Sequence, residues 1–266
     1  LQAAGIETTD ISLLNTVNVR AFSTAAIAAL DTAQIAALGT NQVAALSTTQ
    51  VRELSTSQIA ALESTDLGAM NSAQIAIMNS AQLAAIETTD IGELSTLAIK
   101  AMNTVAVAGL TTDQMAALTS AQLAILTSVQ VSQMDSAQIA AIETTDISSL
   151  NTLAIRGLST AAVEGLTTDQ ITALGTNQVA AMLSTQVQAL TSAQIAALES
   201  TDFAAMNSAQ VSVFNTLQAV GIETTDIGQL STNNIRALST DALSALDTQQ
   251  IEALGTNQVA VLLTRQ

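Results

Sequence analysis

The chain has 266 residues, of which 48% are apolar but only 1% aromatic, and it contains no proline, cysteine, histidine, tryptophan or tyrosine. Its 22 acidic and 6 basic residues give a net charge of −16, which disfavours nucleic-acid binding because phosphate contacts need clustered lysine and arginine. The lack of cysteine excludes disulfides and thiolate metal sites, and the lack of histidine excludes nucleophilic catalysis with a histidine base.

An eight-residue repeat runs through the whole chain, because every eighth residue from Thr8 to Thr264 is serine or threonine, without insertion or deletion. We number each octad from the residue before this Ser/Thr. Position one is mostly a residue that caps helices, and position four is usually Gln or Asp. Position five is almost always Ile, Val, Leu or another large apolar residue, positions six and seven are mostly Ala, and position eight is usually Leu, Met or Ile, as in residues 31–38. Such a strict period is typical of arrays in which each unit packs on copies of itself.

Each octad has the signature of a helix start. A side-chain oxygen at position one can accept from the backbone N–H at position four, and a Gln at position four can reach back to the first N–H. A single continuous helix is excluded, since eight residues at about 100° each would turn the apolar stripe by about 80° per octad. We therefore predict an all-α solenoid of very short helices, one of about seven residues per octad, held by stacking. A β-solenoid, favoured by the β-branched residues at position five, is the alternative.

If the residue at position one is the helix cap, the residue at position two does not need a hydroxyl group for capping. The invariance of Ser/Thr there predicts that each side chain bonds a non-local group, such as a carbonyl of an adjacent coil, unless position two is itself the cap. We also expect positions five and eight, including the seven methionines, to form the core. The first members of this predicted structural row are Thr8, Thr16, Thr24, Thr32, Thr40 and Thr48.

A longer repetition is superimposed on the octads. Glu-Thr-Thr-Asp or Glu-Ser-Thr-Asp occurs at residues 7–10, 63–66, 87–90, 143–146, 199–202 and 223–226, and a shift of seventeen octads carries the first three onto the last three. Duplication of a segment explains this most simply. We predict one continuous array of about 33 octads over residues 1–266, itself a segment of a longer array.

The charged residues follow the same plan. Four bases each lie at position six of the octad that follows the octad of one of these glutamates, namely Arg20, Lys100, Arg156 and Arg236. This placement predicts recurrent ionic contacts between coils or chains. The alternative is that these bases and acids form solvated pairs on the surface. Acids are favourable at helix N-termini through the helix dipole. They are also candidate calcium ligands, although calcium takes six to eight oxygens and would need stacked octads or waters. These candidates are Glu7, Asp10, Glu63, Asp66, Glu87, Asp90, Glu143 and Asp146. No catalytic or cofactor-binding residue is predicted.

Two further observations concern location. No apolar run approaches the roughly 20 residues that span a bilayer, because Ser or Thr recurs at every eighth position. The first residues, Leu-Gln-Ala-Ala-Gly-Ile, lack the basic region of a signal peptide.

An octad together with the leucine before it, as in residues 46–54 and 190–198, reads Leu-Ser/Thr-Xaa-Xaa-Gln-Ile/Val with a closing Leu. This pattern resembles repeats of very large bacterial secreted or surface proteins of the adhesin and RTX-associated kind. The resemblance covers essentially the whole chain and implies an extracellular or cell-surface location. The glycine-rich calcium nonapeptides of RTX proteins are missing. We predict a structural, non-enzymatic protein that forms an extracellular filament or an adhesin stalk by coil stacking and self-association. The alternative is a module that binds a repetitive surface, such as glycan, mineral or ice, through its Ser/Thr row.

Overall fold

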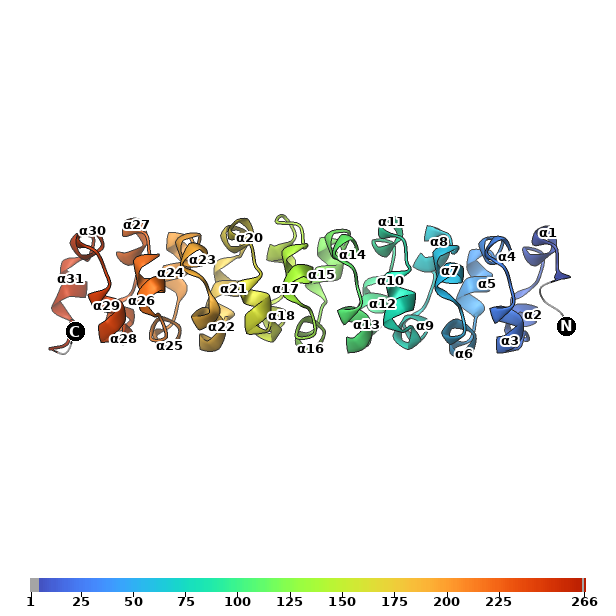
Figure 1. Ribbon diagram of the computed structural model, residues 1–266, viewed down its shortest axis with the longest axis horizontal. Helices are drawn as coiled ribbons and strands as arrows, with labels where there is room; N and C mark the ends of the chain where they lie inside the picture. The colour runs from blue at the N-terminus through green and yellow to red at the C-terminus, as the bar shows by residue number, and fades with distance from the viewer. Residues whose placement is uncertain (1–4, 265) are drawn as a thin grey trace. The chain divides into compact units, whose positions relative to one another are not determined.

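The computed structural model describes residues 5–264 and Gln266, and its 31 short α-helices confirm the predicted all-α solenoid (Figure 1). These residues contain no strand, so the β-solenoid alternative is wrong. Residues 1–4 and 265 of the predicted array lie outside the described part of the chain.

The chain divides into two compact units, Leu1–Gln133 and Met134–Gln266. The helices of the first unit are α1 (Thr8–Ile11), α2 (Thr16–Arg20), α3 (Thr24–Ala28), α4 (Thr32–Ala36), α5 (Thr40–Ala45), α6 (Thr48–Arg52), α7 (Thr56–Ala60), α8 (Ser64–Gly68), α9 (Ser72–Ile77), α10 (Ser80–Ala84), α11 (Thr88–Ile91), α12 (Thr96–Ala101), α13 (Thr104–Ala108), α14 (Thr112–Ala116), α15 (Ser120–Ala124) and α16 (Ser128–Val131).

The second unit follows the same pattern, with a 3-10 helix in the octad that begins at Glu143. Its helices are α17 (Ser136–Ala140), η2 (Ile147–Ser149), α18 (Thr152–Gly157), α19 (Thr160–Glu164), α20 (Thr168–Ala173), α21 (Thr176–Ala181), α22 (Ser184–Ala189), α23 (Ser192–Ala196), α24 (Ser200–Ala205), α25 (Ser208–Val211), α26 (Thr216–Val220), α27 (Thr224–Ile227), α28 (Thr232–Ala237), α29 (Thr240–Ser244), α30 (Thr248–Glu252) and α31 (Thr256–Ala260).

The N-cap of each α-helix is the residue at position one, and the helix begins at the Ser/Thr of position two. In α4, the Asp31 carboxylate accepts from the backbone N–H of Gln34 at 2.8 Å, while Oε1 of Gln34 accepts from the backbone N–H of Asp31 at 2.9 Å. These two bonds satisfy two of the N–H groups that every helix start leaves unpaired. The cap is therefore at position one, and the suggestion that position two is the cap is wrong.

Each helix ends because the residue at position eight and the cap that follows it are both extended. Leu46 has φ −57° and ψ 137°, and Ser47 has φ −72° and ψ 156°. The N–H of Leu46 bonds the carbonyl of Val43 three residues earlier, at 3.1 Å, so the last turn is tighter than an α-turn. The helices consequently span four to six residues and not the predicted seven. No residue of the described chain needs a positive φ to make these turns.

Three octads complete one coil, because each helix packs on the helix that lies three octads earlier. In the first unit, for example, α2, α5, α8, α11 and α14 form one column, and in the second unit α18, α21, α24, α27 and α30 form another. Position five lies inside the coil: Ile35 and Val43 are fully buried, and Leu38 and Leu46 at position eight are 3–4% exposed. The predicted core is confirmed in most octads, but Ile251 and Val259, at position five of two late octads, are 43% and 50% exposed.

Candidate functional site

Where position four is glutamine, its side chain connects one coil to the coil before it. Oε1 of Gln42 accepts from the N–H of its own N-cap, Gly39, at 2.7 Å. Nε2 of the same side chain donates to the carbonyls of Ile11 at 2.8 Å and Leu14 at 2.6 Å, both in the preceding coil. The carbonyls at positions five and eight lie at the end of a helix, where no N–H of the same helix continues the pattern. One side chain thus satisfies polar groups of two coils at once.

The same arrangement recurs along both units, with Nε2-to-oxygen distances of 2.6–3.1 Å to the carbonyl of position eight. Nearly all of these glutamines are 1–5% exposed. We call them the glutamine ladder: Gln34, Gln42, Gln50, Gln58, Gln74, Gln82, Gln114, Gln122 and Gln130 in the first unit, and Gln170, Gln178, Gln186, Gln194, Gln210, Gln218, Gln250, Gln258 and Gln266 in the second.

The hydroxyl of position two does bond a non-local group, but only in some octads. Thr40 donates to Oδ1 of Asp66 at 2.9 Å, and Ser64 donates to Oδ1 of Asp90 at 2.5 Å. Ser208 donates in the same way to the amide oxygen of Asn234. The acceptor in these octads is thus the side chain at position four of the next coil and not the expected backbone carbonyl. The remaining threonines of the predicted row donate no hydrogen bond to any described residue: Thr8, Thr16, Thr24, Thr32 and Thr48.

Position two is also tightly packed against position seven of the next coil. A Cβ added at Gly109 would lie 2.3 Å from Cβ of Ser80, and one at Gly165 would lie 2.5 Å from Cβ of Ser136. Distances this short are not tolerated between real side-chain atoms. Small residues at both positions therefore let successive coils approach closely, which is one reason why position two accepts only Ser or Thr.

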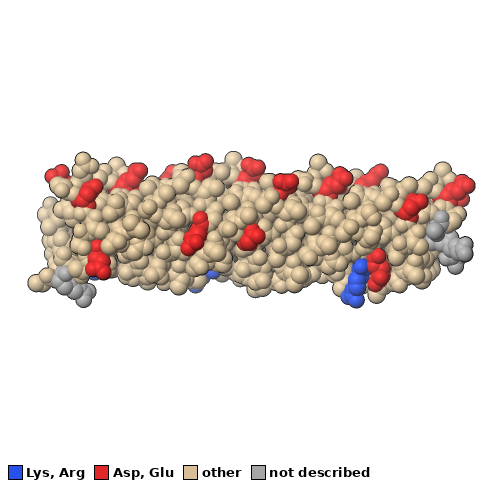
Figure 2. Space-filling view, viewed as in Figure 1, with Lys and Arg blue, Asp and Glu red and all other residues tan. Residues whose placement is uncertain are grey.

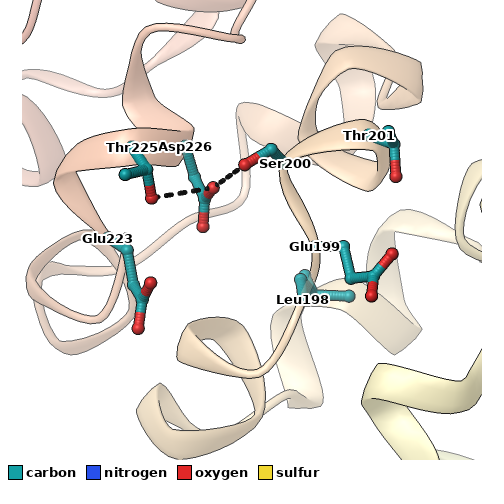
Figure 3. A pocket seen from close by; sticks show the side chains of 7 residues that line it. All are labelled: Leu198, Glu199, Ser200, Thr201, Glu223, Thr225 and Asp226. Atoms are coloured by element: carbon teal, nitrogen blue, oxygen red, sulfur yellow. Dashed lines mark hydrogen bonds between the residues drawn. The ribbon is translucent and has the colours of Figure 1, made fainter.

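Two of the acidic octads lie one above the other in each unit. Glu199, Ser200 and Thr201 at the start of α24 face Glu223, Thr225 and Asp226 at the start of α27 across an open hollow of about 440 Å³ (Figure 3). Asp226 accepts hydrogen bonds from the hydroxyls of Ser200 and Thr225 (Figure 3). The first unit has the equivalent hollow, of about 410 Å³, between the octads that begin at Glu63 and Glu87. The octad of Glu7 borders a third hollow together with Asp31.

Four carboxyl groups at position four, those of Asp66, Asp90, Asp202 and Asp226, are buried where a glutamine amide would otherwise lie. Burial raises the pKa of Asp66, against the opposing effect of the Thr40 hydroxyl bond, and burial likewise raises the pKa of Asp202. Asp66 is 2% exposed, and its Oδ2 is buried without a hydrogen-bond partner in the described chain. An ionised carboxylate has no proton to give, so these residues cannot bond the carbonyls of the preceding coil as glutamine does.

The predicted calcium ligands are distributed over separate octads. Glu63, Asp66, Glu87 and Asp90 come from two successive coils of the first unit, Glu7 and Asp10 lie in an earlier coil, and Glu143 and Asp146 belong to the second unit. Within residues 5–264 and 266, no three acidic side chains are grouped so that they could hold a metal ion together.

The four bases of the predicted ionic contacts are exposed. Among the described residues, none of these four makes an ion pair, and Arg156 instead donates from Nη1 to the carbonyl of Ala181 at 3.4 Å. Acidic side chains clearly outnumber basic ones on the visible face of each unit (Figure 2). The ionic contacts between chains stay a prediction.

Comparison with known proteins identifies the repeat. The pattern described as the ALTTAQ repeat matches seven stretches of the chain: residues 3–40, 35–65, 59–86, 83–120, 139–176, 195–232 and 219–256. The chain belongs to the ALTTAQ repeat family. Six of the seven matches begin shortly before the glutamate of an acidic octad, such as Glu7, Glu63 or Glu87, so the ALTTAQ repeat follows the longer repetition as well as the octad.

No curated protein matches this ALTTAQ repeat chain. Its described helices, none longer than six residues, are too short for any of them to cross a bilayer.

Sequence reasoning identified one half of the role of the glutamines. The capping box was predicted from position one and position four, and the structure contains it in α4 and many other helices. The amide bonds to the preceding coil were missed. The recurrence of Gln directly before the buried position five could have indicated them. A side chain at that place is buried with its neighbour, and a buried amide needs hydrogen-bond partners.

Proposed function

We propose that this ALTTAQ repeat protein is a structural, non-enzymatic protein that forms an extracellular filament or the stalk of a secreted or surface adhesin. The glutamine ladder carries the proposal. The largest set of buried polar side chains in each unit is used to join one coil to the next, by the same bonds each time. A chain built in this way can be lengthened by adding coils, which is the property that a stalk or filament requires.

The composition supports the same proposal. The coils bury small aliphatic side chains, and large apolar residues at position three remain exposed in several octads, among them Val105 and Val129 in successive coils. Exposed apolar side chains on a surface of low charge density favour association between chains. The resemblance of the octad to repeats of bacterial adhesins and RTX-associated proteins adds the extracellular or cell-surface location and the bacterial origin.

Electron microscopy tests self-association directly. The purified chain is imaged in negative stain over a hundredfold range of concentration, with its mass followed by light scattering. The proposal expects particles of constant width that lengthen with concentration and shorten again on dilution. Compact globules with the mass of one chain at every concentration would contradict it. Irregular aggregates of variable width would also contradict it, because they indicate non-specific association.

A second function is favoured by a specific observation, namely the exposed position-two hydroxyls that bond no described residue. Such hydroxyls are free to bind a repetitive surface such as a glycan, a mineral or ice. The test substitutes Thr32→Val and Thr48→Val together and measures retention on cellulose, chitin, hydroxyapatite and ice, with circular dichroism to confirm the fold. Loss of retention with an intact fold supports the binding module. Equal retention of variant and parent, or none by either, removes it.

A further inference from the structure

Each unit contains a coil without ladder glutamines that follows a complete coil of the same unit. In residues 87–110 the three residues at position four are Asp90, Ala98 and Ala106, and in residues 223–246 they are Asp226, Asn234 and Ala242. We call these two stretches the glutamine-free coils. The first packs on residues 63–86 through α8 with α11, α9 with α12 and α10 with α13, and the second packs on residues 199–222, for example through α24 with α27 and α26 with α29.

Two other stretches lack glutamine at position four, namely residues 7–30 and 143–166. Neither is seen on a complete coil of its own unit, because only residues 5 and 6 of the described chain precede the first and a single octad of the second unit precedes the second. The two glutamine-free coils are therefore the three-octad stretches of the described units that lack ladder glutamines and also pack on a complete preceding coil.

Few hydrogen bonds cross the interface below each glutamine-free coil. In the first unit, Ser64 donates to Asp90, and the amide of Asn103 donates to the carbonyls of Ala76 and Met78, each at 3.1 Å. By contrast, Gln122 and Gln130 donate their amides to carbonyls of residues 87–110, while Gln114, in the octad directly after these residues, donates to the carbonyls of Leu83 and Ile86 in residues 63–86. The glutamine-free coil of the first unit is therefore joined by the ladder on one side only.

The missing amides leave carbonyls without donors. In the first unit the carbonyls of Leu62 and Met70 accept no hydrogen bond from any described residue, and both residues are 2–3% exposed. The equivalent carbonyls of Leu198 and Phe214 in the second unit likewise accept none from the described chain. A buried carbonyl without a partner is unfavourable, and elsewhere the ladder provides that partner.

The same interface brings like charges together. Glu63 and Glu87 both line one hollow, and Glu199 and Glu223 both line the equivalent hollow of the second unit. No base of the described chain lines either hollow. Close packing stabilises this interface, since Ala98 and Ala106 are fully buried and Gly109 lies against Ser80. That contact supplies no donor for the carbonyls and no positive charge for the carboxylates.

We propose that each unit opens first at the interface below its glutamine-free coil. In the first unit this interface lies between residues 63–86 and 87–110, and in the second unit it lies between residues 199–222 and 223–246. The stack is thereby divided into segments that separate at defined places when the protein is strained or partly unfolded. This inference does not depend on the proposed function, because it concerns contacts within a single chain.

Trypsin offers a matched test, because the chain holds only six basic residues. Lys100 lies in a glutamine-free coil, and Arg52 lies at the same octad position in residues 31–54, a coil with Gln34, Gln42 and Gln50; both basic side chains are exposed. Cleavage within a helix requires local opening, so the native cleavage rate reports how readily each coil opens. Each rate is divided by the rate at the same site in the chain unfolded in urea. We expect Lys100 to be cut at least about tenfold faster than Arg52, which is the effect of losing a few hydrogen bonds.

Two variants make the test specific. Gln42→Ala with Gln50→Ala removes the ladder below Arg52, and cleavage at Arg52 should then rise toward the rate at Lys100, which itself stays unchanged. Asp90→Gln supplies a donor for the carbonyl of Leu62 and should slow cleavage at Lys100 several-fold. Equal normalised rates at Lys100 and Arg52 in the parent chain would overturn the proposal, as would an Asp90→Gln chain that is cut at Lys100 as fast as the parent. If the double variant does not fold, these two results decide.

Discussion

Replacement of one glutamine of the ladder is the most direct test of what holds the coils together. Gln58 is 3% exposed, and its side chain makes three hydrogen bonds: Oε1 accepts from the N–H of Ser55 at 2.8 Å, and Nε2 donates to the carbonyls of Ile27 at 3.0 Å and Leu30 at 2.8 Å. In Gln58→Ala the carbonyl of Leu30 loses its donor, and the amide of Ser55 loses its acceptor.

The expected cost follows from these bonds. A buried polar group left without a partner costs about 1–3 kcal/mol, while the N–H of exposed Ser55 can turn to water. We therefore expect Gln58→Ala to lower the free energy of unfolding by about 1–3 kcal/mol. Gln58→Glu should cost at least as much, because a carboxylate has no N–H to donate to the two carbonyls.

Urea unfolding followed by circular dichroism, together with hydrogen exchange of the amides in residues 24–62, measures the change. Gln188→Ala is the matched control, because Gln188 is an exposed helical glutamine and its loss should change the free energy by less than about 0.5 kcal/mol. If Gln58→Ala and Gln188→Ala had the same small effect, the ladder would not be a source of stability and the argument from it would fail.

Three more substitutions test other contacts. Gly109→Ala should cost about 1–3 kcal/mol in urea unfolding, because its Cβ would lie 2.3 Å from Cβ of Ser80, whereas Gly92→Ala, whose nearest neighbour is 3.6 Å away, should be neutral or slightly stabilising. Thr40→Val removes the hydroxyl bond to Asp66 and should cost about 1 kcal/mol, while Thr48→Val should leave the unfolding midpoint unchanged. Asp66→Asn should stabilise the protein at pH 7 by about 1 kcal/mol, since an amide can bond the preceding coil as Asn234 bonds the carbonyl of Met206 at 2.8 Å. Burial raises the pKa of Asp66 above its ordinary value of 3.8, so the folded state holds the proton more tightly, and the parent loses stability as the pH rises through the raised pKa. The advantage of Asp66→Asn should therefore shrink as the pH falls toward 3.8, and an advantage that grew in acid would refute the assignment.

Local structure was largely predictable because it depends on contacts within one octad. Asp31 and Gln34 form the predicted capping box, and Ile35 and Leu38 are buried as their period requires. The number of octads in a coil was not predictable, because it depends on the extended backbone at positions eight and one, as in Leu46 and Ser47, and no single residue type determines those angles.

The hydrogen-bond partners in neighbouring coils also could not be predicted from the sequence. Gln42 reaches back to Ile11 and Leu14, and that spacing follows only once the coil length is known. The Ser/Thr of position two illustrates the same difficulty. Its invariance indicated a contact, but whether the partner is a carbonyl, a carboxylate or the backbone of position seven depends on how closely the coils approach.

The near-equivalence of the three octads in a coil has a consequence for how such genes lengthen. Most octads offer the same amide to the octads before them and the same carbonyls to those after them, so insertion of one whole octad leaves the register of the backbone intact. The inserted surface residues, however, appear on a new side of the molecule. Glu7 lies in the column of α1, α4 and α7, but Glu87, its copy ten octads later, lies in that of α5, α8 and α11. Copying by octads therefore redistributes surface chemistry around the molecule while preserving its interior.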